Sequence, residues 1–186
     1  MTTRVEIRQL LAQGRYALSS GRVKEAVPLI QAQPALAAYL IELLFDPDLG
    51  ISQRAADVLE RVSHKPSPAL CRILARSKDA LVGLLPEAHP KKLRWNLART
   101  LGRLPLTVTD CRRCADILST WLDDPSSIVK TAALQCLADL THQDPSLLPM
   151  VLDLLRIHSR SGTPAMRARG RLLLAHLEKT REKEAR

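Results

Sequence analysis

The feature that most constrains the fold of this chain is a helical pattern that returns about every forty residues. An apolar residue followed by a polar or basic one recurs at spacings of 42, 36 and 37 residues, as Ile51-Ser52, Leu93-Arg94, Val129-Lys130 and Met166-Arg167. Seven residues after the second member of each pair stands a leucine: Leu59, Leu101, Leu137 and Leu174. Self-similarity with one helical hairpin per period is typical of a stacked α-solenoid.

Helical periodicity extends over almost the whole chain. Apolar residues recur at i, i+3, i+4 and i+7, and no segment keeps a period of two. Only five of the 186 residues are Phe, Trp or Tyr, which also favours helices over a β-sandwich or barrel. We expect ten helices in five antiparallel hairpins because the connections between them are short. The predicted helices span residues 3–19, 22–32, 34–45, 51–64, 67–85, 90–104, 109–122, 126–142, 145–158 and 164–182.

Two helix starts carry a recognisable signal, since Ser67-Pro68 and Asp144-Pro145 each place a capping side chain before a proline. The apolar stripe that begins at Leu70 keeps one phase across Ser77-Lys78. This continuity predicts a single helix over 67–85.

The third period resembles the HEAT family of repeats. Its turn Asp123-Asp124-Pro125 and the pair Val129-Lys130 match the aspartate and the second-helix basic residue of that family, although this pairing is only partial in the other periods. The resemblance covers roughly residues 34–180 and implies an all-α, right-handed α-α superhelix, a HEAT/armadillo-like solenoid of about five helical hairpins.

The resemblance also suggests a domain organisation. An atypical capping hairpin is expected at 1–33, and Gly14, Tyr16 and Ala26 would also fit a tetratricopeptide-like hairpin there. Four HEAT-like repeats follow at 34–66, 67–108, 109–143 and 144–180, and 181–186 form a fraying C-terminal tail.

Export and membrane insertion are not expected. The first residues contain no apolar core of signal-peptide length. The longest apolar stretch, Leu36 to Phe45, contains Glu42. At ten residues, this stretch is too short to span a bilayer. The four cysteines are therefore expected to be reduced and the protein cytoplasmic.

Cys111-Arg112-Arg113-Cys114 is the one motif with a redox or metal-ligand spacing. No second pair of this kind accompanies it, and Cys114 lies on the apolar stripe of its helix, so packing is the favoured interpretation. The sequence has no nucleophile elbow, no phosphate-binding glycine loop and no H-E-x-x-H. We therefore expect no enzyme activity, no metal site and no cofactor.

The charge of the chain points to a partner surface. Its net charge is +9, and the cations are concentrated in residues 67–108 and 144–186. In HEAT-like stacks the second helices line the concave face, so the resemblance places their outward residues there. The residues selected as partner-binding anchors on this face are Arg54, Arg61, Trp95, Arg99, Arg103 and Arg169.

Two functions are compatible with such a surface. The favoured hypothesis is a non-enzymatic scaffold that binds an acidic or mixed-charge segment of another protein, with a monomer as the default state. The alternative is nucleic-acid binding through the same face together with Lys91, Lys92 and Arg94. A variant resembling the HEAT-like DNA glycosylases has less support, because Trp95 has no neighbouring acid in its repeat.

Overall fold

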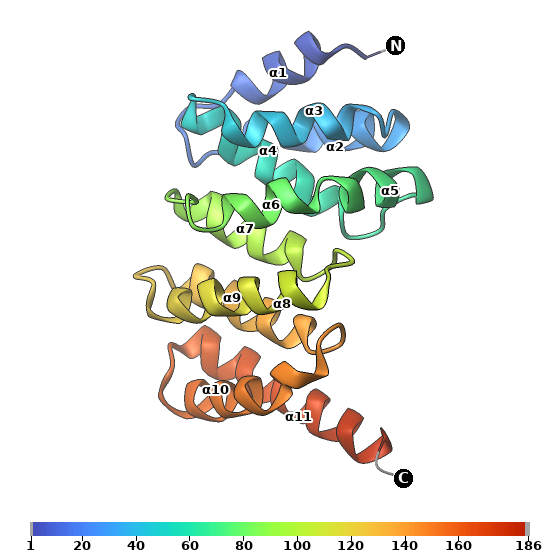
Figure 1. Cartoon of the computed structure of the whole chain (residues 1–186). Coiled ribbons are helices and arrows are strands. Elements are labelled where there is room, and N and C mark those ends of the chain that lie inside the picture. The colour runs from blue at the N-terminus through green and yellow to red at the C-terminus, as the bar shows by residue number, and fades with distance from the viewer. Residues whose placement is uncertain (1, 185–186) are drawn as a thin grey trace. The chain divides into compact units, whose positions relative to one another are not determined.

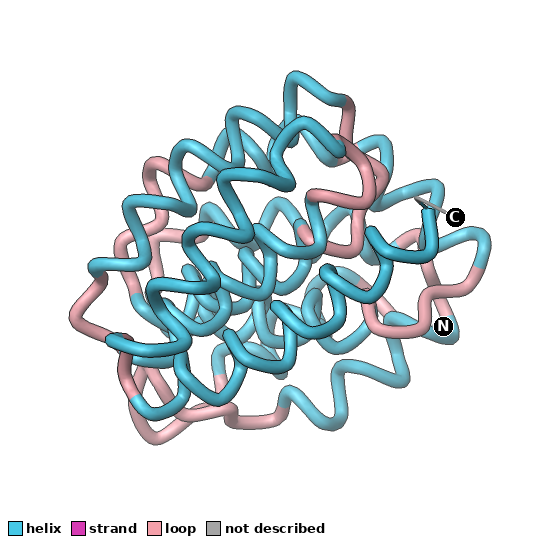
Figure 2. Tube along the Cα trace, turned by 90° about the horizontal axis from the view of Figure 1, so that it is seen from below, coloured by secondary structure: helices cyan, strands magenta, loops and turns pink. Residues whose placement is uncertain are grey.

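The computed structural model describes residues 2–184, and these form eleven α-helices and three short 3-10 helices without any strand (Figure 2). They divide into two compact units, Met1–Leu104 (unit 1) and Pro105–Arg186 (unit 2). Across residues 2–184, no helix combines the length and the apolar character that crossing a membrane requires.

Unit 1 consists of two layers of helices (Figure 1). The first helices of its hairpins pack side by side in one layer, and the second helices α2, α4 and α7 pack in the other. The elements are α1 (Arg4–Ala12), α2 (Val23–Ala32), α3 (Leu36–Glu42), η1 (Leu43–Phe45), α4 (Leu49–Val62), α5 (Pro68–Arg76), α6 (Lys78–Leu84) and α7 (Lys91–Leu101).

Helix α4 is the centre of unit 1. It packs against α1, α2, α3 and α7, and every residue of the helix except Leu49 and Arg61 is buried. Its apolar residues, such as Ile51, Ala55 and Leu59, account for only part of this surface. The polar residues on the remaining face must therefore find partners within the protein, since a buried polar group without one is costly.

Unit 2 is built around α9, which contacts α8, α10 and α11. Its core is formed by small and branched apolar residues such as Val129, Ala133 and Leu137, all fully buried. The elements are α8 (Val108–Thr120), η2 (Trp121–Asp123), α9 (Ser127–Leu140), η3 (Pro145–Leu147), α10 (Leu148–Ser161) and α11 (Pro164–Glu184). Helix α11 includes 181–184 of the predicted tail, and residues 185 and 186 lie outside the described residues.

Both predicted capping signals are present. The Ser67 hydroxyl accepts a hydrogen bond from the Leu70 amide, and Pro68 begins α5. The Asp144 carboxylate accepts one from the Ser146 amide, but the turn that follows is the 3-10 helix η3, after which α10 begins.

Two of the predicted helices were wrong. The single helix expected over 67–85 is divided at Ser77, whose ψ of 6° interrupts the helix between α5 and α6. The helix expected over 3–19 ends at Ala12, and the extended Gln13 begins a loop that continues to Arg22. Apolar spacing alone did not reveal this loop because its position depends on contacts with α4, described below.

Gly21 fixes the end of this loop. Its φ is +47°, and a Cβ at this position would lie 1.9 Å from the Gln13 carbonyl oxygen. We expect Gly21→Ala to lower the free energy of unfolding by about 1–3 kcal/mol, because a side chain disfavours this backbone conformation. Urea unfolding followed by circular dichroism measures the difference.

Gly83 provides the matched control. It lies inside α6, and a Cβ there would meet no atom within 4 Å. Gly83→Ala should raise the free energy of unfolding by about 0.5–1 kcal/mol, because alanine favours a helix. Equal effects of the two substitutions would contradict a special role for Gly21.

Candidate functional site

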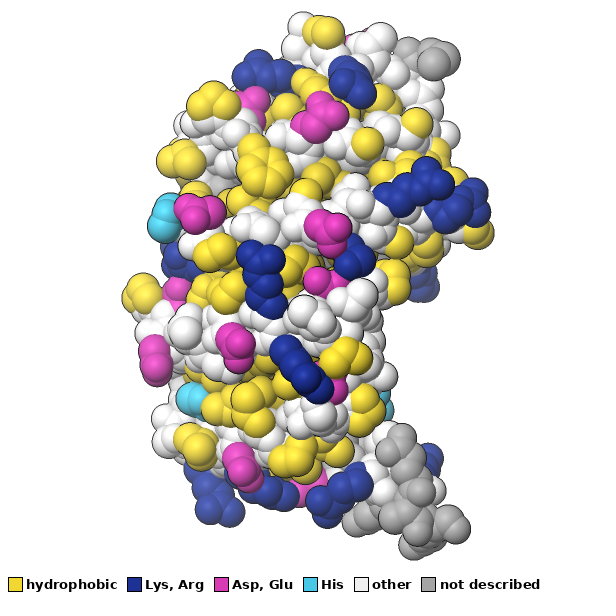
Figure 3. All heavy atoms as spheres, viewed as in Figure 1, with side chains coloured by type: hydrophobic (Ala, Val, Ile, Leu, Met, Phe, Trp, Pro, Cys, Tyr) yellow, Lys and Arg dark blue, Asp and Glu magenta, His cyan; other side chains and the backbone are white. Residues whose placement is uncertain are grey.

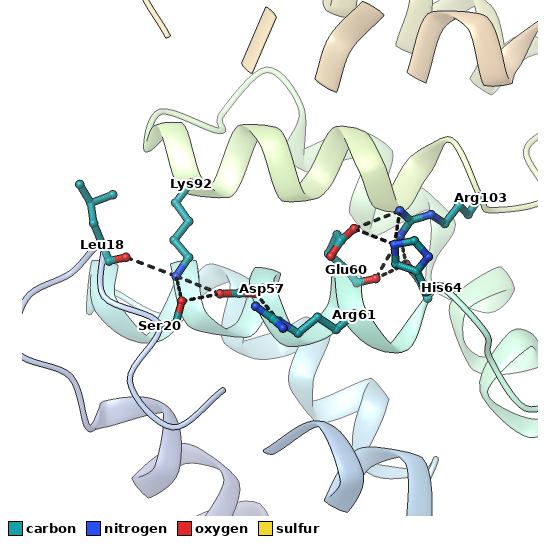
Figure 4. A network of polar contacts seen from close by, with 9 residues as sticks. Leu18, Ser20, Asp57, Glu60, Arg61, His64, Lys92 and Arg103 are labelled. Carbon is teal, nitrogen blue, oxygen red and sulfur yellow. Dashed lines mark hydrogen bonds and ion pairs between the residues drawn. The ribbon is translucent and has the colours of Figure 1, made fainter. Parts of the chain in front are cut away.

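The polar face of α4 meets α7 in two ion-pair clusters (Figure 4). In the first, the Asp57 carboxylate binds three donors. The Arg61 Nε lies 2.7 Å away, the Lys92 Nζ 3.0 Å away and the Ser20 hydroxyl 3.1 Å away. Lys92 is 3% exposed and Asp57 6%, so this pair joins α4 to α7 within the protein interior.

The second cluster lies at the other end of α7, just after its last residue, Leu101. The Arg103 guanidinium binds the Glu60 carboxylate at 3.0 Å, and also the Glu60 carbonyl and the Ser63 hydroxyl, each at 3.0 Å. The His64 Nε2 lies 3.0 Å from the Arg103 Nη2 and 3.5 Å from the Glu60 carboxylate. Arg103 therefore fastens the segment after α7 to the end of α4.

Arg54 holds the loop between α1 and α2. Its side chain is 3% exposed and donates hydrogen bonds to the carbonyl oxygens of Leu11, Tyr16 and Ser19, the last two at 3.3 and 3.5 Å. Burial lowers the pKa of this guanidinium, and the nearby Asp48 partly opposes the shift. The interactions of Arg54 are therefore within the fold.

The Asp57 carboxyl group is held in its ionised form. Burial by itself would raise its pKa, but the hydrogen bonds from Arg61 and Lys92 outweigh that effect, and the pKa lies below its ordinary value. The charge of Asp57 is thus compensated by cations from two helices.

The structure places the six predicted anchor residues in different environments. Five belong to unit 1, where Arg54 is buried, Arg61 and Arg103 form ion pairs, and Trp95 and Arg99 are half-buried on α7. Arg169 is exposed on α11 of unit 2. Burial of Arg54 excludes it from contact with a partner, because a buried side chain presents no surface.

Lys92 also differs from its predicted role. It was expected to contact phosphates in the nucleic-acid alternative, but its ammonium group is buried against Asp57. Its position before the Leu93-Arg94 pair gave no signal of burial. Glu60, the partner of Arg103, was likewise missed, because it lies outside the face chosen by helical phase.

The face shown in Figure 3 carries charges of both signs. Over α3, α5 and α6 of unit 1, lysine and arginine side chains lie among carboxylates and apolar side chains rather than in one continuous field. A positive net charge therefore does not produce a single-sign surface on this side.

The two cysteines of the C-x-x-C motif are buried thiols. Burial raises the pKa of Cys111, and it raises the pKa of Cys114 to about 12, with further contributions from nearby groups. Within residues 2–184, no group of three or more His, Cys, Asp or Glu side chains could hold a metal ion. The geometry fits packing of these thiols in unit 2, since reactive thiols have a lowered pKa.

Solved structures show the same architecture. An archaeal HEAT-like repeats protein from Thermococcus onnurineus NA1 has a TM-score of 0.63 and 18% identity, over 91% of this chain and 63% of that protein. This chain therefore spans less than two thirds of the length of the archaeal protein. Two engineered proteins have TM-scores of 0.66 and 0.61 and identities of 16% and 19%. Their matches cover 95% and 96% of this chain, and 79% and 87% of theirs.

These similarities confirm the predicted fold class. The chain has an all-α, HEAT-like repeat fold, and identities below one fifth show the fold alone. No protein-family model matches the sequence, and a search of curated proteins gave no match.

The Asp57 cluster predicts a pH-dependent stability. Because the pKa of Asp57 is lower in the folded protein, its contribution is complete above the ordinary value of about 3.9 and is lost as pH falls below it. We expect Asp57→Asn to be less stable than the wild type by about 1–3 kcal/mol near neutral pH. The difference should shrink between about pH 5 and pH 2 in urea titrations.

Asp116→Asn is the control for this measurement, since Asp116 is an exposed carboxylate on α8. Its stability should differ from that of the wild type by less than about 0.5 kcal/mol at neutral pH. If the difference in unfolding free energy between the wild type and Asp57→Asn stays constant down to pH 2, the charge of Asp57 is not what stabilises the fold.

The cysteines predict a simple labelling pattern. Cys71 is exposed, whereas Cys111, Cys114 and Cys136 are buried. We expect one thiol to react rapidly with Ellman's reagent in the native protein, and all four thiols to react rapidly in guanidinium chloride. Cys71→Ser should abolish the rapid reaction, and two or more rapid thiols in the native protein would contradict the packing interpretation of the C-x-x-C motif.

Proposed function

We propose that this chain is a non-enzymatic helical-repeat scaffold that binds an acidic or mixed-charge segment of another protein. The proposed surface is the exposed side of α7 in unit 1, together with the end of α4. Its contact residues are Trp95 and Arg99 on α7, bordered by Arg61 and Arg103. We propose further that the protein is a cytoplasmic monomer and uses no cofactor.

The observation that carries this proposal is that carboxylates of α4 compensate three of the neighbouring cations, Arg61, Lys92 and Arg103. Asp57 binds both Arg61 and Lys92, and Glu60 binds Arg103. Ion-paired cations have little net charge to offer a phosphate backbone, whose affinity comes from successive cation contacts. Their mixed charge suits a protein segment, which can exchange polar contacts at an interface without requiring a continuous positive field.

Trp95 and Arg99 are the proposed anchors because of their type and position. Tryptophan and arginine dominate the binding energy of many protein interfaces. Both side chains are half-buried. One part of each side chain packs within the helix layer, and the other part remains accessible to a partner. Arg99 forms no ion pair with another of the described residues, which leaves its guanidinium to a partner carboxylate.

Arg169, in unit 2, is proposed as an additional basic contact residue. It is exposed on α11, and its contribution can be measured separately. Arg54 is omitted from the surface because its side chain is buried.

The test uses the full chain and a displayed library of random 15-residue peptides. We expect the retained peptides to be enriched in Asp and Glu. Labelled with fluorescein, they should lose at least about tenfold in affinity when Trp95 and Arg99 are both changed to alanine, because interface anchors of these types contribute about 2 kcal/mol or more each. Fluorescence anisotropy measures the affinity.

Arg72→Ala is the matched charge control, because Arg72 is an exposed arginine on α5 in the other helix layer. It removes the same charge as Arg99→Ala and should leave the affinity within about twofold. Unchanged affinity of the double variant would place the binding site elsewhere on the chain.

A second arm tests nucleic acid, for which the net charge of +9 is the supporting observation. Duplex and single-stranded DNA are titrated at about 50 and 200 mM salt, where a phosphate-binding protein loses several decades of affinity. Tight binding at low salt that depends on Trp95 and Arg99, with no retained acidic peptides, would replace the protein-binding proposal by the nucleic-acid one.

A further inference from the structure

The loop between α1 and α2, residues 13–22, lies across the polar face of α4 and is referred to here as the clamped loop. It has no helical hydrogen-bond ladder, yet its backbone is held at several points by buried cations of the other elements. Arg54 donates to the Tyr16 and Ser19 carbonyls at 3.3 and 3.5 Å, and to the Leu11 carbonyl just before the loop.

Lys92 provides the second point of attachment. Its ammonium group lies 3.4 Å from the Leu18 carbonyl and 3.4 Å from the Ser20 hydroxyl, while it also binds Asp57 at 3.0 Å (Figure 4). The Ser20 hydroxyl donates to the same Asp57 carboxylate at 3.1 Å. Two buried charges are thus used to hold a surface loop to α4 and α7.

Whereas Ser20 is directed toward Asp57, three larger side chains of the clamped loop are exposed to solvent: Arg15, Tyr16 and Leu18. Tyr16 is 65% exposed and Leu18 is 42% exposed, although both are large apolar side chains. Arg15 is exposed as well, and the loop contains no acidic residue. The result is an apolar and basic surface on a backbone that is already ordered.

The clamped loop lies next to the surface proposed for α7. Lys92 belongs to the first turn of α7, and Trp95 follows it three residues later on the same helix. The Lys92 ammonium group lies 3.4 Å from the Leu18 carbonyl oxygen (Figure 4), which places the loop backbone at Leu18 close to the first turn of α7. A segment bound along α7 would therefore meet Leu18 when it extends toward the start of the helix.

We propose that the clamped loop is a preordered recognition element that binds an apolar side chain of the same partner segment, through Tyr16 and Leu18. This inference rests on the proposed function and adds the chemistry of the partner. The segment carries an aromatic or branched aliphatic residue for the loop, adjacent to carboxylates that face Arg15 and Arg99.

Preordering is the physical reason for this assignment. Ordering a flexible loop during association reduces affinity, whereas a loop that is already fixed avoids this loss. Tyrosine gives a large contact area with few rotatable bonds, and it is enriched at energetically important interface positions. The hydrogen bonds from Arg54 and Lys92 fix the backbone while both apolar side chains remain available.

The binding test uses the acidic peptides retained from the displayed library. The variant Tyr16→Ala with Leu18→Ala should lower their affinity at least about fivefold, and the retained sequences should contain an aromatic or aliphatic residue beside the acidic ones. Ile157→Ala is the control, since Ile157 is 55% exposed on α10 of unit 2 and should leave the affinity unchanged.

The loop inference and the proposed function fail in different ways. If the loop variant retains full affinity while the Trp95 and Arg99 variant loses it, the α7 surface stands and the loop inference is overturned. If only the loop variant loses affinity, the loop is a binding element and the assignment of α7 is wrong. If neither variant loses affinity, both are wrong.

Limited trypsin digestion tests the preordering without a partner. In the wild type, cleavage after Arg15 should be at least about tenfold slower than in a synthetic peptide with residues 9–20, because proteolysis requires local opening. Lys92→Met should accelerate this cleavage. Its circular dichroism spectrum and unfolding transition establish that the variant is folded.

Ser20→Ala is a milder second variant, which removes a hydrogen bond to Asp57 and leaves the ammonium group of Lys92 in place. It should accelerate cleavage less than Lys92→Met does. Cleavage of the wild type as fast as that of the peptide would overturn the inference, because the loop would then not be ordered in advance.

Discussion

The structure of unit 1 depends on the burial of α4 on nearly all sides. A helix in this position would ordinarily be apolar all round, but α4 carries Arg54, Asp57 and Glu60 on its buried surface. Each of these charges is stable there only with a partner, since an unpaired buried charge is very unfavourable. The partners come from the loop before α2, from α7 and from the segment that follows it. The polar side of α4 therefore determines how its neighbours are held.

This arrangement changes the meaning of the positive charge. A chain with +9 suggests a surface for anions, yet in unit 1 Arg61, Lys92 and Arg103 are used for internal ion pairs. Net charge is a sum over the sequence, whereas recognition depends on which charges remain uncompensated at the surface. Trp95 and Arg99 matter to the proposed function for this reason, and Lys92 acts through the loop that it holds.

Local patterns predicted most of the fold. The apolar periodicity and the recurring pairs gave the all-α repeat architecture, and Ser67 with Pro68 marked a helix start, because these signals are local and depend on backbone chemistry. The break at Ser77 and the loop after Ala12 were missed, since an unbroken apolar phase is compatible with either conformation. Helical phase also placed Arg54 on an outward face. It is buried because the loop that covers α4 comes from a distant part of the sequence, and no periodicity within α4 reports that contact.

The clamped loop has a consequence for how such a protein can change in evolution. Solenoids often gain or lose repeats because each repeat presents its neighbours with the same kind of interface. In unit 1 the second hairpin is matched individually on both sides, with Arg54 and Asp57 facing the first hairpin and Asp57 and Glu60 facing the third. Deleting or duplicating that hairpin would leave charged side chains, such as Lys92 and Arg103, against neighbours that lack their ion-pair partners. The three hairpins of unit 1 are thus expected to be preserved as a block, while length variation is confined to other junctions.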